Sequence, residues 1–318
     1  EYEDVDATDI FVGRLTANLL EESSAGLILT SGDPRANLDN QLLGLDFTYR
    51  NSRLAGGKRL EANAWYQQSD TQGLSGDDAA YGFGVVYPSQ TGLRAGVGAS
   101  EIQENFKPAL GFVRRSGVRR FVGDVSYTYR FTDRRLESIA AGVDAQRVNY
   151  IGGELQSQRI VVTGLDLRNQ IGDRLDVVYN IRKENLLRGF EISDGILIAP
   201  GPYTFANTQL TFGTSDARVA DLEIGAQFGE LYTGTFESYE AEASWRPSRH
   251  FTGSIFYAVD FVDLPEGKFD NRVLSADLTV AFTNTLSWVN LIQFDNVSND
   301  LGIDSRFHWA PEPGRNFY

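Results

Sequence analysis

Apolar and polar residues alternate one by one along most of this chain. From Phe121 to Phe131 every second position is aromatic, Gly or Val, and the positions between them from 124 onward are Asp, Ser, Thr and Arg. The same period recurs at 43–50, 60–67, 174–182 and 274–282. A period of two is that of a β-strand whose two faces meet different surroundings. Helical periodicity is almost absent, so the pattern predicts an all-β chain.

The alternating segments are long for strands. They run about 10 to 13 residues, whereas strands of soluble proteins are mostly about 5 to 6 residues long. A tilted strand needs about 9 to 11 residues to cross a bilayer. Counting the segments predicts about 16 to 18 strands.

Turn signals fall into two alternating classes. Short polar turns are expected at 54–57, 88–92, 132–135, 169–173, 213–217, 246–250, 283–285 and 311–315. Longer connections are expected at 31–40, 69–78 and 191–201. Short turns at one end and longer loops at the other are typical of outer-membrane barrels.

A soluble sandwich is the alternative to a membrane barrel. A single alternating strand fits both, but a sandwich of so many long strands needs two very broad sheets and leaves edge strands to protect. Closure into a barrel removes those edges and pairs every backbone group, which lipid requires. The pattern therefore predicts a transmembrane antiparallel up-and-down β-barrel as one domain over 1–318. Aromatic residues near the strand ends are expected to form its interfacial girdles: Tyr49, Tyr66, Phe131, Phe212, Trp245 and Phe282.

Composition narrows the function classes. The formal net charge is −14, which argues against nucleic acid as a partner. The chain has no Cys, so disulfides and thiol chemistry are excluded. Its longest apolar run, Ile255 to Val259, is far shorter than the roughly 20 residues of a transmembrane helix. The start of the chain has neither Met nor a signal-like segment, which we interpret as a mature or internal fragment.

Charged residues on the polar face are the main candidates for function. In a barrel these positions are expected to face the lumen: Asp46, Arg50, Asp124, Arg130, Asp166, Arg168, Asp176, Arg182, Asp221, Glu223, Glu240, Glu242, Asp260 and Asp277. Such mixed charges either set the ion preference of a pore or pair across the wall. The excess of carboxylates predicts that an open pore prefers cations.

One basic cluster stands out in this acidic chain, Arg114, Arg115, Arg119 and Arg120 in "RRSGVRR". These arginines either form a solvated loop edge or pair with neighbouring carboxylates in salt bridges. Alternatively they form a site for lipopolysaccharide phosphates at the outer rim, or an inward-folded constriction.

The sequence offers little for catalysis or metal binding. His308, Ser305 and Asp304 are the residue types of a hydrolase, but on a strand they do not all share a face. Oxygen donors at 295–304 lack the spacing of a calcium loop, so a hairpin turn is the better interpretation. We therefore expect no catalytic residues, no metal, no cofactor and no enzyme activity in this chain.

Three segments carry a resemblance to a known family. They are "PALGFVRRSGVRRF" (108–121), "VDLPEGKFDNRVLSADLTVAF" (262–282) and "LIQFDNVSNDLGIDSRFHWAPEPGRNFY" (291–318). They resemble a bacterial outer-membrane family that joins an N-terminal domain similar to carbohydrate-binding module family 9 to a C-terminal β-barrel domain of unknown function (domain of unknown function 5916). The family's closing motif corresponds to Arg306, Trp309, Pro313, Gly314, Phe317 and Tyr318.

The resemblance implies a bacterial outer-membrane location and leaves the activity open. It implies a channel, or a membrane anchor or scaffold for an attached domain or partner complex; the alternative is a carbohydrate-active hydrolase whose catalytic part lies outside this chain. The implied partners are outer-membrane lipids and lipopolysaccharide, a protein partner or plug in the lumen, and a glycan bound through the N-terminal domain. Compared with the family, we expect this chain to be the barrel part of a longer protein, without that domain and the first strands and with a final strand cut short at Tyr318.

Overall fold

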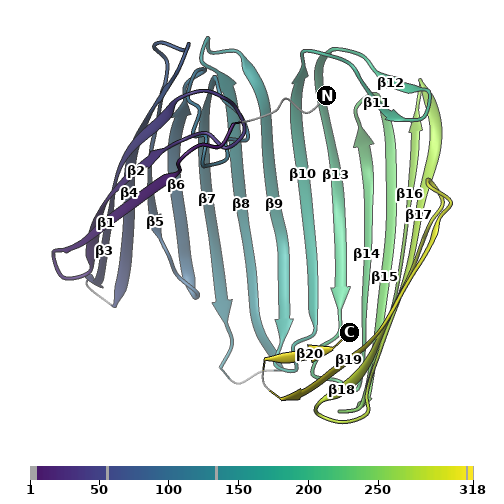
Figure 1. The fold of residues 1–318 in the computed structure, drawn as a ribbon. Coiled ribbons are helices and arrows are strands. Elements are labelled where there is room, and N and C mark those ends of the chain that lie inside the picture. Colours follow the sequence, from purple (N-terminus) through teal and green to yellow (C-terminus); the bar gives the residue numbers. More distant parts are fainter. Residues whose placement is uncertain (1–5, 55–56, 133–134, 313, 318) are drawn as a thin grey trace. The chain divides into compact units, whose positions relative to one another are not determined.

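The computed structural model describes residues 6–54, 57–132, 135–312 and 314–317, and these residues form strands, turns and loops without a helix. They contain an 18-stranded sheet and a separate two-stranded hairpin. The paired strands are antiparallel, and within each unit consecutive strands of the large sheet lie side by side (Figure 1). Among the described residues no helix has the length and apolar character needed to span a membrane. The all-β, antiparallel up-and-down arrangement and the strand number are as predicted.

The chain divides into two compact units, residues 1–127 with 142–160 and residues 128–141 with 161–318. The first unit contains β1 (Phe11–Leu19), β2 (Ser23–Ser31), β3 (Asn40–Leu54), β4 (Lys58–Thr71), β5 (Ala79–Tyr87) and β6 (Gly92–Ile102). Three strands contribute residues to both units: β7 (Val118–Arg130), β8 (Leu136–Tyr150) and β9 (Leu155–Asn169).

The second unit contains the remaining strands, which are β10 (Arg174–Leu186), β11 (Phe190–Ser193), β12 (Ile196–Ile198), β13 (Gly201–Gly213), β14 (Ala220–Leu231), β15 (Gly234–Ser248), β16 (Phe251–Leu264), β17 (Gly267–Ala281), β18 (Leu286–Asp295), β19 (Leu301–Glu312) and β20 (Arg315–Phe317). Strands β11 and β12 pair only with each other.

The predicted short turns all lie at strand ends, although 55–56, 133–134 and 313 are outside the described residues. At the other strand ends the longer connections expected at 31–40 and 69–78 are confirmed at 32–39 and 72–78. The long connection expected at 191–201 is also present, but it contains the β11–β12 hairpin, and 103–117 is a further long connection. The junctions at 232–233 and 265–266, for which the sequence predicted no loop length, contain only two residues each. Tyr232 makes the first of these tight by adopting a left-handed conformation, with φ of 48°.

The two faces of the sheet differ in each unit. We call the side of Leu45, Tyr66 and Phe83 in the first unit, and of Ile224, Tyr257 and Leu274 in the second, the apolar face, and the opposite side the polar face. The large side chains on the apolar face are exposed rather than buried in a protein core. No second layer of the described chain covers them, which excludes a sandwich packed through this face within either unit.

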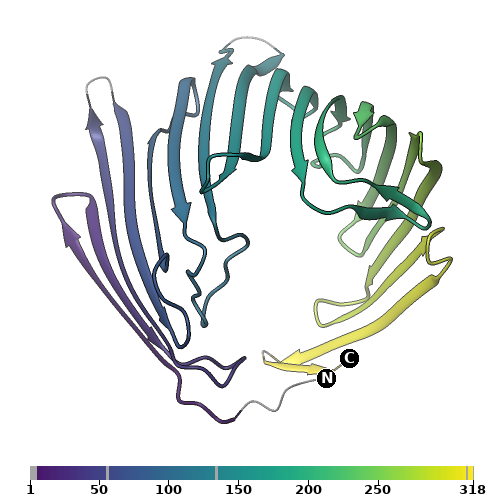
Figure 2. The same ribbon diagram turned by 90° about the horizontal axis from the view of Figure 1, so that it is seen from above.

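Two long segments fold over the polar face. In the first unit, Phe106 of the 103–117 segment packs against Leu42 and Ala80. In the second unit, the β11–β12 hairpin places Ile196 and Ile198 against Val262 and Leu264. Figure 2 shows the ribbon of this hairpin, in teal-green, bent toward the strands that follow it. The polar face is therefore apolar where these segments rest on it, which the alternation alone did not predict.

Candidate functional site on the polar face of the sheet

The predicted charged residues occupy the polar positions of their strands. In the second unit the register connects them across neighbouring strands: Asp176 is opposite Thr211, Thr211 opposite Gly225, and Gly225 opposite Glu240. Asp260 lies opposite Ser238 on the next strand pair, and Asp277 opposite Ser254. In the first unit Asp46 is opposite Trp65, on the side away from Leu45 and Tyr66. The period of two was thus sufficient to assign these residues to one face.

About half of these groups form ion pairs. Arg14, which the sequence did not single out, lies 2.6 Å from Asp46, and Arg94 lies 3.7 Å from Asp124. The other pairs are Arg50–Glu61, Arg130–Glu137, Arg168–Asp166, Arg174–Glu223 and Arg246–Asp221. Most of these side chains are partly solvent-exposed, so each pair contributes little, typically below about 1 kcal/mol.

Four carboxylates on β15, β16 and β17 have no hydrogen bond or ion pair within the described part of the chain: Glu240, Glu242, Asp260 and Asp277. We call them the unpaired carboxylates. Glu242 lies directly opposite Glu223, and like charges so placed repel each other. Gly225 provides the space for Glu240, since a Cβ at Gly225 would collide with the Glu240 carboxylate. The unpaired carboxylates make this part of the polar face negative.

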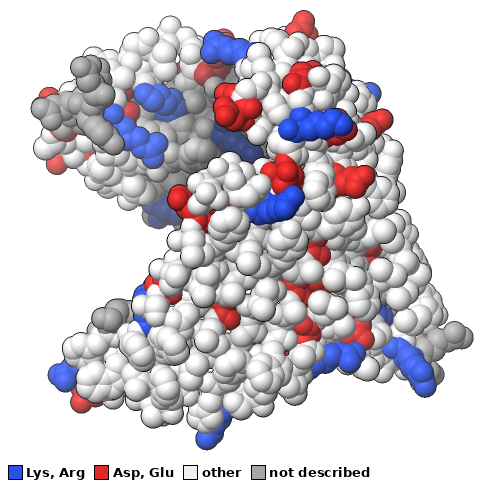
Figure 3. Space-filling view, turned by 90° about the vertical axis from the view of Figure 1, so that its right-hand side faces the viewer, with Lys and Arg blue, Asp and Glu red and all other residues white. Residues whose placement is uncertain are grey.

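Acidic and basic side chains also lie close together on the molecular surface. Figure 3 shows one face, on which Asp and Glu lie beside Lys and Arg, with wide areas between them that carry neither. The charge of each part of this surface therefore depends on whether its carboxylates lie beside a Lys or Arg side chain.

The four arginines of "RRSGVRR" are not brought together into one site. Arg119 and Arg120 are adjacent in β7 and therefore lie on opposite faces. Arg119 forms an ion pair with Glu101, whereas Arg120 donates to the Gln146 side chain at 2.9 Å. Arg115 donates to Gln156 and Ser157, at 2.9 and 3.2 Å.

The segment 103–117 is held by buried polar side chains. The Asn40 side chain, 1% exposed, donates to the Lys107 carbonyl at 2.8 Å and accepts from the Ala109 N–H at 3.2 Å. The Ser69 hydroxyl accepts from the Lys107 N–H at 2.9 Å. These bonds satisfy the buried side chains of Asn40 and Ser69, so the segment has a defined position over the sheet. No pattern in the sequence predicts these hydrogen bonds, because they join residues far apart in the chain.

Tyr232 anchors the β11–β12 hairpin in the second unit. Its ring contacts Phe190, Tyr203 and Phe205, and its hydroxyl donates to the Glu184 carboxylate at 3.1 Å. Burial, together with the charge and hydrogen bond of Glu184, raises the pKa of Tyr232 to about 12. The hydroxyl is therefore a permanent donor at neutral pH.

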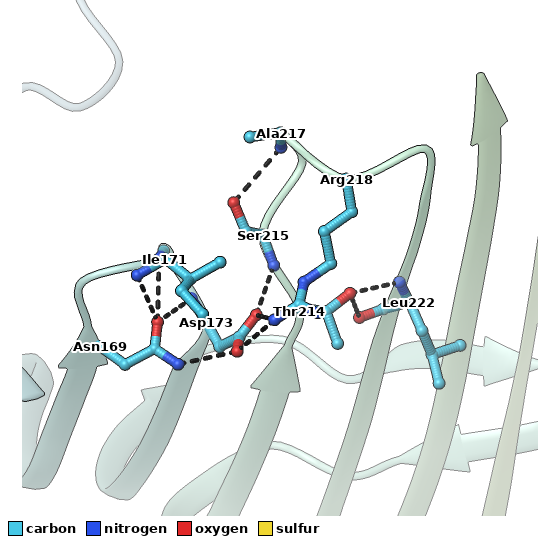
Figure 4. Close-up of polar contacts among 9 residues, drawn as sticks. Asn169, Ile171, Asp173, Thr214, Ser215, Ala217, Arg218 and Leu222 are labelled. Atoms are coloured by element: carbon cyan, nitrogen blue, oxygen red, sulfur yellow. Dashed lines mark hydrogen bonds and ion pairs between the residues drawn. The ribbon is translucent and has the colours of Figure 1, made fainter. Parts of the chain in front are cut away.

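Asp173 lies in the short turn between β9 and β10 and forms hydrogen bonds with the short turn between β13 and β14 (Figure 4). Its carboxylate accepts from the Ser215 N–H at 2.8 Å, from the Asn169 side chain at 2.7 Å and from Arg218 at 2.7 and 2.8 Å. The Ser215 and Asn169 hydrogen bonds lower the pKa of Asp173, and Arg218 adds to the effect. These hydrogen bonds hold the two turns in contact with each other.

The three residues of the hydrolase candidate lie on both faces of β19, as their spacing predicted. Ser305 lies on the apolar face, where Trp288 donates to its hydroxyl at 3.0 Å, while Asp304 and His308 occupy polar-face positions. In the 295–304 segment Asp295 accepts from the backbone N–H groups of Val297 and Ser298, which is the hairpin turn expected there. Within the described residues no three His, Asp or Glu side chains are close enough together to hold a metal ion.

The fold and the two-faced sheet define a class, the all-β antiparallel up-and-down proteins. No family model and no curated protein matches this chain. Among solved structures it is similar to a multiply substituted mutant of the Rh. blastica porin, with 12% identity and a TM-score of 0.39 over 96% of this chain and 100% of the porin chain. A similarity with that TM-score carries no argument about the function of this chain.

Proposed function

We propose that this chain forms the wall of a bacterial outer-membrane β-barrel that conducts cations. The observation that supports the proposal is the exposed apolar face, which runs along the strands with charged residues on the opposite side. Lipid is the solvent that suits the first face, and water suits the second. Outer-membrane lipids and lipopolysaccharide are its proposed partners, in agreement with the family that the sequence resembles.

The unpaired carboxylates support a preference for cations. Rings of Asp and Glu side chains select cations in channels, and a carboxylate without a cationic neighbour keeps its full field. Glu240, Glu242, Asp260 and Asp277 are such groups, whereas Asp221 and Glu223 are neutralised by arginines. We assign the ion preference to these four residues.

Reversal potentials in planar bilayers under a KCl gradient test this assignment. The wild type is expected to prefer K⁺, and a variant with E240Q, E242Q, D260N and D277N is expected to lose most of that preference. The matched control removes four exposed loop carboxylates by D77N, E154Q, D216N and D300N, and should keep it. Anion preference in the wild type, or an equal change in both variants, would contradict the proposal.

The second candidate function is a membrane anchor or scaffold with a filled lumen. It is favoured by the two segments that fold over the polar face, 103–117 and β11–β12, because they occupy space that ions would need. A folded, inserted protein that carries no current in the same bilayers would select the scaffold. A glycan partner or a hydrolase would then depend on a domain outside these residues.

A further inference from the structure

The segment 103–117 and the loop 32–39 border a pocket of about 470 Å³ in the first unit. It is a feature that ion conduction does not require. Its lining residues come from these two connections and not from the strands.

The pocket is positively charged in an acidic protein. Arg35, Lys107, Arg114 and Arg115 line it, against the single carboxylate of Asp33. Asp33 is 2% exposed and is occupied by the Arg35 N–H at 2.9 Å and by the Lys107 ammonium at 3.7 Å. Four cationic side chains therefore face one carboxylate.

Two of these cations have donors to spare. Over the residues that the structure describes, the guanidinium groups of Arg35 and Arg114 make no hydrogen bond and no ion pair. A guanidinium has five N–H donors in a fork that matches the oxygens of a phosphate or carboxylate. Two guanidinium groups with unused N–H donors in the same pocket can bind an anion that has several oxygen atoms.

The walls of the pocket are fixed. Asn40 and Ser69 hold Lys107 and Ala109 in place through the buried hydrogen bonds described above. An anion entering the pocket therefore meets donors whose backbone is already ordered, which lowers the cost of binding.

An organic group can bind beside the cations. Phe112, also on the pocket wall, is 84% exposed, and Pro108 and Val113 lie on the same segment. An exposed aromatic ring next to guanidinium groups suits a ligand that carries both an anion and an apolar or ring-shaped part. The segment rests on the polar face through Phe106, so the ligand is a water-soluble solute and not a lipid on the apolar face.

We propose that this pocket binds a small organic phosphate, with Arg35 and Arg114 holding the phosphate and Phe112 contacting the organic part. A dianionic phosphate matches the excess of cations better than a carboxylate does. The site does not depend on ion conduction and can be tested separately from it.

The test is calorimetric titration of phenyl phosphate into the whole folded chain in detergent micelles at low salt. The wild type is expected to bind one equivalent, and the double variant R35Q/R114Q to bind about tenfold more weakly or worse. The matched control, R159Q/R188Q, removes two exposed arginines from outside the pocket and should bind like the wild type. Retention of the folded, SDS-resistant form in both variants shows that a loss is not caused by unfolding.

Each result decides the proposal. No heat with phenyl phosphate in the wild type, or unchanged binding by R35Q/R114Q, would overturn it. Sodium benzoate binding as tightly as phenyl phosphate would show that phosphate is the wrong ligand class. Binding to lipopolysaccharide micelles but not to phenyl phosphate would place the ligand in the lipid phase and refute a soluble solute.

Discussion

At the scale of single residues, Asp173 shows how one carboxylate determines the position of two turns. Three donor groups from the two turns bind it through four hydrogen bonds, and these hydrogen bonds favour its ionised form. Its pKa in the folded protein therefore lies below the ordinary value of 3.8. Stabilisation by Asp173 is then fully present above pH 3.8 and is lost as the pH falls through the lower folded-state pKa.

We expect D173N to melt at a lower temperature than the wild type at pH 7, because the amide cannot accept the same set of hydrogen bonds. The difference should shrink as the pH is lowered below 3.8, where the wild-type carboxylate becomes protonated. Thermal melts followed by tryptophan fluorescence at pH 7 and pH 3 measure it. D216N, in one of the same turns, is the control and should leave the melting temperature unchanged; a D173N melt equal to that control at pH 7 would refute the role.

At the scale of elements, the long connection expected at 191–201 contains the β11–β12 hairpin, which packs against the polar face. Gly195, with φ of 71°, allows the tight turn, and the Glu191 carboxylate accepts from its N–H at 2.5 Å. Ile198, 0% exposed, then packs between the hairpin and the polar face. The hairpin pairs with no other strand, so its side-chain contacts are what hold it there.

Replacing Ile198 by Ala should release the hairpin without unfolding the sheet. Removal of a buried Ile side chain costs about 2 to 5 kcal/mol, and here that cost falls on local opening. We expect trypsin to cut after Arg188 at least about tenfold faster in I198A, measured by mass spectrometry. L197A changes the neighbouring exposed side chain and should be cut at the wild-type rate. Equal rates in the two variants would mean that packing on the polar face does not hold the hairpin.

At the scale of the whole molecule, the question is what solvates the apolar face. In water, Leu274 at the middle of β17, 45% exposed, would tolerate a charged replacement with little effect. In a bilayer the same replacement at the midplane costs about 2 to 4 kcal/mol. The two environments therefore predict different stabilities for one substitution.

We expect L274R to lower the free energy of unfolding from lipid vesicles by about 2 to 4 kcal/mol, measured by urea titration with the heat-modifiable band as readout. Q209R is the control, since Gln209 lies at a polar-face position of β13 beside Val178 and should accept the charge. If L274R and Q209R unfold at the same urea concentration, the apolar face does not contact lipid.

Much of the architecture could be predicted from the sequence because a period of two records which face each residue occupies. It placed Asp176, Glu240 and Asp277 on one side and Ile224 and Leu274 on the other, and it located the short turns. The resemblance of 262–282 and 291–318 to an outer-membrane family stays a prediction.

The sequence by itself determined the strands, their two faces and the acidic balance, since these depend on the order of neighbouring residues. Only the tertiary structure decided which carboxylates are neutralised, how Arg114 was separated from Arg119 and Arg120, and which segments cover the polar face. These outcomes depend on contacts between residues far apart in the chain, such as Arg174 with Glu223 and Asn40 with Ala109. The alternating pattern does not predict these long-range contacts, because strand register and loop packing determine which side chains meet.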